Sequence, residues 1–106
     1  MNQRIRNLTD SFRRGLESIY QARLKGVYLF GSHARGDAGP ESDVDLLVVL
    51  DHFERYGAEV DRTSILGAEL SLAHAVSISE VFVNEHDWSC RRTPFLDNVR
   101  REAVRV

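Results

Sequence analysis

Several features that would point to a secreted, membrane-bound or nucleic-acid-binding protein are scarce in this chain of 106 residues. A single cysteine, Cys90, excludes an internal disulfide framework and favours a reducing compartment. The longest uninterrupted apolar run, Leu46–Leu50, is too short to span a membrane, and the N-terminus lacks the apolar core of a signal peptide. A formal net charge of −2 provides no broad cationic surface for nucleic acid. We therefore expect a cytoplasmic domain that does not enter a membrane and does not bind nucleic acid extensively.

The composition that remains is typical of one small folded domain. An apolar fraction of 42% is ordinary for a globular chain. A chain of this length has room for one modest core, and no repeat, low-complexity tract or linker divides it. We expect a single domain over residues 1–106.

The first third of the chain predicts a helix, a strand and a loop. Apolar residues recur at three- and four-residue steps from Leu8 to about Arg23, which predicts an amphipathic helix that starts near residues 9–11 and ends at Lys25-Gly26. The aromatic and β-branched run Val27–Phe30 predicts a buried strand. The glycine- and proline-containing loop that follows can begin with one helical turn, over Ser32–Arg35.

A second strand is predicted over Asp43–Leu50. Alternation places Asp43 and Asp45 on one face with Leu47 and Val49, and the remaining apolar residues on the other. Because both faces are apolar beyond Asp45, the strand is expected to be central in its sheet, with the two acids at its open end.

The remaining elements complete an α/β (α+β) domain with a small mixed sheet flanked by helices. A long helix is predicted between Asp51 and Ala75, and a strand over Val76–Val83. Strand, helix and strand in this order indicate a right-handed crossover that joins parallel strands. We expect Asn84–Arg92 to be irregular and anchored by Trp88. A short helix from Pro94 to Arg101 and an edge strand over residues 103–106 are expected to follow.

Asp43 and Asp45 are candidate metal ligands. Two residues apart on one strand, they lie roughly 7 Å apart at the backbone. Like charges held this close repel, unless a cation lies between them. Mg²⁺ prefers carboxylate oxygens and keeps positions for water and phosphate. The alternative is that both acids are simply solvated at a strand end.

The turn before the loop supplies candidate phosphate-binding groups. If the two strands are antiparallel neighbours, Gly31 and Ser32 lie beside the acid pair. Glycine allows the backbone to approach an anion, and a helical turn that begins at Ser32 directs free N–H groups at phosphate. Arg35 adds a guanidinium that can bind phosphate oxygens, or can pair with Asp37 or Glu41. The combination indicates a site for a nucleoside triphosphate with Mg²⁺.

These residues resemble a known family. Gly31-Ser32, ten intervening residues and Asp43-Val44-Asp45 are similar to the signature of the DNA polymerase beta-type nucleotidyltransferases. The wider string GSHARG…SDVDLLV, together with the closing segment Pro94–Glu102, resembles the minimal nucleotidyltransferases, the smallest members of that superfamily.

The resemblance implies a mixed sheet flanked by helices and catalysis with two Mg²⁺ ions bound by Asp43 and Asp45. It implies that Gly31 and Ser32 hold the triphosphate of ATP. A third acid on a later strand completes the site in that family, and Glu80 is the candidate here, where the family often has aspartate. The alternative for Glu80 is an edge strand on which its side chain faces water.

The resemblance also implies a partner. Minimal nucleotidyltransferases are commonly paired with small helical HEPN toxins, which they neutralise as antitoxins, in some cases by transferring AMP from ATP to a tyrosine of the toxin. A chain this short has no second domain to bind an acceptor, which favours an acceptor supplied by a partner and favours oligomerisation. Two alternatives remain open: a catalytically inactive binding module that neutralises the toxin by complex formation, and an aminoglycoside-type adenylyltransferase of small molecules.

Overall fold

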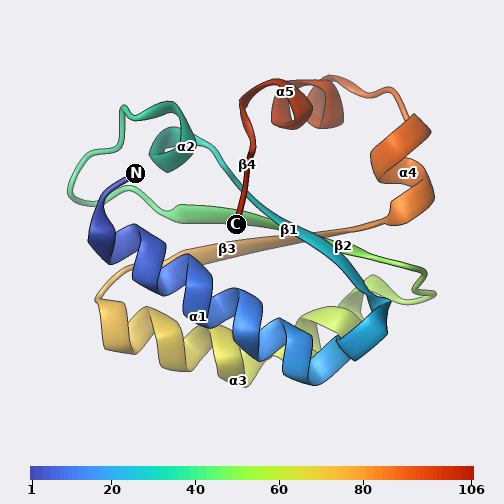
Figure 1. Ribbon diagram of the computed structural model, residues 1–106, viewed down its shortest axis with the longest axis horizontal. Coiled ribbons are helices and arrows are strands. Elements are labelled where there is room, and N and C mark those ends of the chain that lie inside the picture. Colours follow the sequence, from blue (N-terminus) through green and yellow to red (C-terminus); the bar gives the residue numbers. More distant parts are fainter.

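The computed structural model describes residues 1–106. Helices cover both faces of one four-stranded sheet (Figure 1). None of the helices has the length and apolarity needed to cross a bilayer. In chain order, the elements are α1 (Gln3–Tyr20), the 3₁₀ turn η1 (Gln21–Arg23), β1 (Leu24–Phe30), α2 (Ser32–Arg35), β2 (Val44–Leu50), α3 (Tyr56–His74), β3 (Ile78–Asn84), α4 (Glu85–Cys90), α5 (Pro94–Glu102) and β4 (Val104–Arg105).

The sheet has the mixed topology predicted from the sequence. Its strand order is β3-β2-β1-β4, so β2 is an interior strand. β1 pairs with β2 in antiparallel register, and β3 pairs with β2 in parallel register through the crossover helix α3. The expected alternation is also confirmed. Val44, Leu46, Val48 and Leu50 pack on the face covered by α1 and α3, and Leu47 and Val49 pack on the α4–α5 face.

The first helix is longer at its start than the sequence pattern predicted. α1 begins at Gln3 because the side chain of Asn2 accepts a hydrogen bond from the N–H of Ile5, at 2.9 Å, and caps the helix. Ile5 is buried and extends the apolar stripe by one turn. The predicted end at Lys25-Gly26 is wrong, because both residues lie in β1. Pairing with β2 extends this strand toward η1, and Leu24 lies opposite Leu50.

α3 starts later than the sequence predicts and buries one acidic residue. Tyr56, Val60 and Thr63 recur at helical spacing; Thr63 is buried, but Tyr56 and Val60 are 46% and 38% exposed, and Glu59, outside this spacing, is buried. The hydroxyl of Tyr20 donates to Glu59 Oε1 at 2.8 Å, which satisfies this carboxylate between α1 and α3. Leu66 and Leu70 pack against the core as their helical spacing suggests, and the contact with Tyr20 explains why Glu59 is buried with them.

The last third of the chain forms the second helical layer. The expectation of an irregular segment after β3 is wrong, because Asn84 caps a short helix, α4, by accepting from the N–H of Asp87 at 2.8 Å. Trp88 anchors this segment as expected, with its ring centroid 4.9 Å from that of Tyr28. β4 pairs with β1 as the predicted edge strand, and the N–H of Val106 donates to the carbonyl of Val27 at 2.9 Å, so the C-terminus lies beside the middle of β1 (Figure 1).

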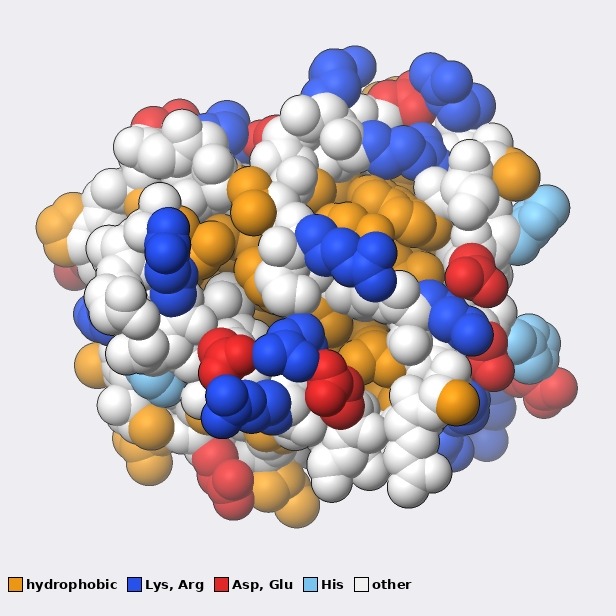
Figure 2. Space-filling model, viewed as in Figure 1, with side chains coloured by type: hydrophobic (Ala, Val, Ile, Leu, Met, Phe, Trp, Pro, Cys, Tyr) orange, Lys and Arg blue, Asp and Glu red, His pale blue; other side chains and the backbone are white.

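The surface carries charges of both signs without a broad basic face in the view of Figure 2. Acidic and basic side chains alternate over α1, where Arg13 pairs with Asp10 and Glu17. Apolar atoms are visible between α1 and α5. The alternation of signs is what a solvated helix face shows.

Candidate active site

The site begins where β1 ends. Gly31 has a φ of 77°, a conformation that favours glycine, and its carbonyl accepts from the N–H groups of Ala34 and Arg35 to open α2. Gly36, with a φ of 87°, ends the same turn. The predicted single helical turn over Ser32–Arg35 is thereby confirmed. It leaves the first N–H groups of α2 without a partner inside the helix.

Gly31 and Asp45 are in close contact. Phe30 lies opposite Asp45 in the antiparallel register, so the turn passes directly over that carboxylate. A Cβ atom on residue 31 would collide with Asp45 Oδ2. Only glycine therefore fits here, both for its φ and for the space available. The expectation that the glycine–serine turn lies beside the acid pair is borne out by this geometry.

The two aspartates form an acid pair in which Asp45 is the partly buried member. Burial and the nearby Asp43 carboxylate raise the pKa of Asp45, and the positive charges of His33 and Arg35 oppose this increase. Neither carboxylate accepts a hydrogen bond or forms an ion pair with a side chain in this structure. No third His, Cys, Asp or Glu side chain joins them at metal-binding distance.

A divalent cation fits this donor set. The carboxylate oxygens are hard ligands with no competing protein donor, and a cation would relieve the repulsion that raises the pKa of Asp45. Two carboxylates leave most positions of an octahedral ion for water and phosphate oxygens, as Mg²⁺ prefers.

Arg35 lies next to the acid pair but is not free. Its Nε donates to Asp37 at 3.2 Å and its Nη1 donates to Glu102 at 2.9 Å. The pairing with Asp37 was one of the alternatives drawn from the sequence. Glu41, the other alternative, does not contact Arg35. The second partner of Arg35 is instead Glu102, 67 positions later in the chain. No local pattern indicates the contact between Arg35 and Glu102, because it forms only when the end of α5 packs near α2.

Glu80 lies on the opposite face of the sheet from the acid pair, which corrects its assignment to the site. In the parallel register Asp45 lies beside Ser79, and Glu80 lies beside Leu46. Neighbouring residues of a strand point to opposite faces, so Glu80 faces α3. Its Oε2 accepts from the hydroxyl of Thr63 at 3.1 Å, and its Oε1 is buried without a partner. β3 is an edge strand, as the alternative reading supposed, but α3 covers much of this side chain.

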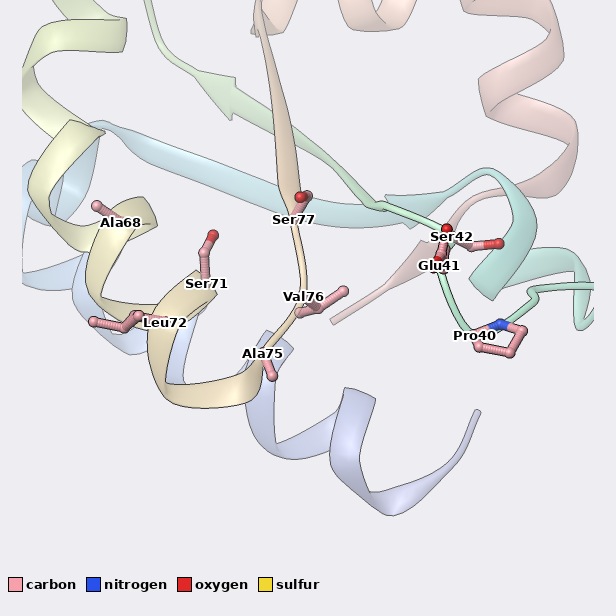
Figure 3. A pocket seen from close by; sticks show the side chains of 9 residues that line it. All are labelled: Pro40, Glu41, Ser42, Ala68, Ser71, Leu72, Ala75, Val76 and Ser77. Carbon is pink, nitrogen blue, oxygen red and sulfur yellow. The ribbon is translucent and has the colours of Figure 1, made fainter.

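A groove of about 510 Å³ opens next to the loop that leads to Asp43, and neither aspartate lines it. It lies between the loop that precedes Asp43, the last turns of α3 and the chain that enters β3 (Figure 3). Ser42 lines this groove and precedes Asp43 in the chain. The carbonyl of Ser42 lies 3.3 Å from His33 Nε2, which links the loop to α2. No local sequence pattern indicates this groove, because its walls come from three separated segments.

This arrangement brings candidate anion-binding and cation-binding groups together where the end of β1 lies beside the start of β2. The backbone of Gly31, the start of α2 and Arg35 can bind phosphate oxygens, and the acid pair can hold the accompanying metal ion. The chemistry that such a site supports is phosphoryl or nucleotidyl transfer, in which positioning and charge stabilisation carry the reaction.

Comparison with known proteins agrees with this geometry. The nucleotidyltransferase domain family matches residues 10–99 of the chain. One candidate protein adenylyltransferase of Methanocaldococcus jannaschii is 36% identical over 81 residues, which are 76% of this chain and 81% of that protein. Another from the same organism is 29% identical over 99 residues, 93% of this chain and 95% of that protein.

Solved structures share the fold at low sequence identity. A toxin–antitoxin complex crystallised with AMP-PNP superimposes with a TM-score of 0.64 at 19% identity, over 91% of this chain and 70% of that one. A Shewanella oneidensis complex of a tri-AMPylated HEPN toxin with its MNT antitoxin gives a TM-score of 0.55 at 15% identity, over 92% and 70% of the two chains. The family match over most of the chain, and the relative at 36% identity, show that the chain is a nucleotidyltransferase of the nucleotidyltransferase domain family.

Proposed function

We propose that this nucleotidyltransferase transfers AMP from ATP, with Mg²⁺, to a hydroxyl on a partner HEPN toxin, in particular that of a tyrosine, and thereby acts as an antitoxin. The observation that carries the proposal is the contact between Gly31 and Asp45, which brings a phosphate-binding turn against a metal-binding carboxylate. Protein adenylyltransferase relatives and toxin–antitoxin structural neighbours support the choice of reaction and partner.

The chain's own residues supply binding and orientation. Asp43 and Asp45 would hold Mg²⁺, and Gly31, Ser32 and Arg35 would hold the triphosphate with its α-phosphate next to the acid pair. Bound Mg²⁺ would lower the pKa of the attacking hydroxyl and stabilise the charge on the triphosphate. The hydroxyl oxygen attacks the α-phosphorus in line and its proton passes to water, the bond between the α-phosphorus and the bridging oxygen breaks, and pyrophosphate leaves. No covalent intermediate with the protein is needed.

Exposed apolar residues on α3 support an acceptor that a partner protein delivers. Ile65 and Leu72 are 73% and 86% exposed, and their spacing of seven residues places them on one face of α3. Leu72 also lines the groove beside Ser42, one residue before the acid pair (Figure 3). Exposed apolar side chains gathered on one helix face are typical of surfaces that a partner covers.

The test is label transfer with purified components. Wild type, incubated with labelled ATP, Mg²⁺ and the HEPN protein of the same organism, should label that protein, and the Asp43→Asn/Asp45→Asn variant should not. Asp51→Asn, an exposed aspartate just after the far end of β2 and outside the α3 face that carries Ile65 and Leu72, is the matched control and should behave as wild type. Equal labelling by wild type and the double variant would refute the catalytic role of the acid pair.

A second candidate, neutralisation by binding alone, is favoured by one observation: Glu80 does not join the acid pair, so the site has two carboxylates where the family resemblance implies three. This candidate predicts that the Asp43→Asn/Asp45→Asn variant still protects cells that express the toxin. Labelling of a free aminoglycoside without any protein partner would support a small-molecule acceptor instead.

A further inference from the structure

Glu102, the last residue of α5, is placed beside the active site by tertiary packing. Leu96 and Val99 of α5 are buried against the sheet, and the ring centroid of Phe95 lies 5.8 Å from that of Phe30, next to Gly31. Beyond Glu102, β4 pairs with β1. Packing and strand pairing therefore fix the helix end on which Glu102 sits.

The Glu102 carboxylate holds Arg35 from outside the α2 turn. The distance between Glu102 Oε2 and Arg35 Nη1 is 2.9 Å, and only 22% of the Glu102 side chain is exposed, against 48% for Arg35. The other partner of Arg35, Asp37, is two residues away, 63% exposed, and belongs to the same loop. The ion pair with Glu102 is thus the contact that holds the Arg35 guanidinium to an element outside its own loop.

The ion pair lies on the turn that contacts the acid pair. Arg35 is the last residue of α2, which begins directly after Gly31, and a Cβ atom on residue 31 would collide with Asp45 Oδ2. Arg35 has five N–H donors, of which the two ion pairs engage two. The remaining donors are available to an anion that binds beside Asp45.

We propose that Glu102 is a positioning residue of the nucleotide site, which aims the Arg35 guanidinium at the triphosphate and makes nucleotide affinity depend on the docked C-terminal segment, α5 and β4. The inference rests on the proposed function. Glu102 itself does not touch the reacting atoms. Loss of its charge should therefore weaken the binding of MgATP and change the rate at saturating MgATP little.

The experiment is a double-mutant cycle on the full chain, with MgATP binding measured by isothermal titration calorimetry. Wild type, Glu102→Gln, Arg35→Ala and the double variant are compared, with Glu69→Gln on the exposed face of α3 as the control. Glu102→Gln should weaken MgATP binding about 3- to 10-fold, the range for loss of a charge-assisted contact. The double variant should bind no more weakly than Arg35→Ala, because Glu102 acts through Arg35.

Additional measurements separate positioning from folding. Glu102→Asp, which keeps the charge, should recover part of the affinity that Glu102→Gln loses, and thermal unfolding of each variant reports any loss of structure. In the transfer assay the KM for ATP should rise for Glu102→Gln, while kcat falls less than about twofold.

The outcomes distinguish this inference from the proposed function. Wild-type affinity in Glu102→Gln, or additive losses in the cycle, would overturn the positioning role while leaving the proposed function intact. A fall in MgATP affinity that follows the loss of thermal stability, with no recovery in Glu102→Asp, would also overturn it. Failure of the wild type to bind MgATP at all would refute the proposed function and this inference together.

Discussion

Replacing Glu80 by methionine separates the two roles that this acid can have. If Glu80 were the third carboxylate of the active site, its loss would abolish AMP transfer. In the structure it faces α3, with Oε1 buried and unpaired. Methionine has a similar length and no charge to bury. We therefore expect Glu80→Met to keep its activity and to be more stable than wild type.

The expected gain in stability is about 1 kcal/mol. A buried, unpaired polar atom costs about 1–3 kcal/mol, and the lower end applies because Glu80 is only partly buried and water screens part of its charge. Thr63 is not left unpaired by the change, since its hydroxyl also lies within hydrogen-bond distance of the carbonyls of Glu59 and Val60, at 3.2 and 3.3 Å. For a domain of this size, 1 kcal/mol raises the midpoint of thermal unfolding by roughly 4 °C.

The pH dependence of the free energy of unfolding provides a second, independent test of the burial of Glu80. Burial raises the pKa of Glu80 above its ordinary value of 4.5, although the hydrogen bond from Thr63 opposes this. The folded protein thus takes up this proton at a higher pH than the unfolded chain, so wild type gains stability as the pH falls through the raised pKa and loses it as the pH rises. The advantage of Glu80→Met should be largest near neutral pH and shrink toward pH 4.5.

The assay is urea unfolding of both proteins at several pH values, with AMP transfer measured on the same samples. A folded Glu80→Met protein that has lost more than about tenfold in kcat would refute the assignment of Glu80 to the α3 face. A lower free energy of unfolding than wild type at neutral pH would refute the electrostatic argument.

Three further predictions concern the core and the site. Tyr20→Phe should lower the free energy of unfolding by about 1–3 kcal/mol, because it removes the hydrogen bond to the buried Glu59 carboxylate. In urea titrations, the double variant Tyr20→Phe/Glu59→Leu should recover much of the lost stability, because it no longer buries the carboxylate. Gly31→Ala should weaken MgATP binding at least tenfold, about 1.4 kcal/mol or more, because the added Cβ collides with Asp45, while Gly36→Asn in open space should bind normally; equal calorimetric affinities would contradict this. Because the pKa of Asp45 is raised, Mg²⁺ affinity should fall on acidification at a higher pH than an ordinary aspartate would give; a fall at the pH of an ordinary aspartate, measured by calorimetry across a pH series, would contradict the raised pKa.

The correspondence between sequence and structure is closest where an interaction is local. The chain pattern predicted the helical turn at Ser32, the two faces of β2 and the parallel crossover to β3, because side-chain alternation and turn chemistry act over a few residues. Helix limits were less accurate. α1 gains a turn from the Asn2 cap, and α4 depends on the Asn84 cap, two short-range signals that apolar periodicity alone does not detect.

The sequence by itself determined the motif Gly31-Ser32 and Asp43-Val44-Asp45, and with it the family and the two halves of the site. Only the tertiary structure decided which other charged side chains lie near these residues and which face away from them. The register of β3 against β2 turns Glu80 toward α3, since a shift of one residue moves a side chain to the other face of a sheet. The packing of α5 brings Glu102 to Arg35 across 67 positions, a contact that no short-range pattern encodes.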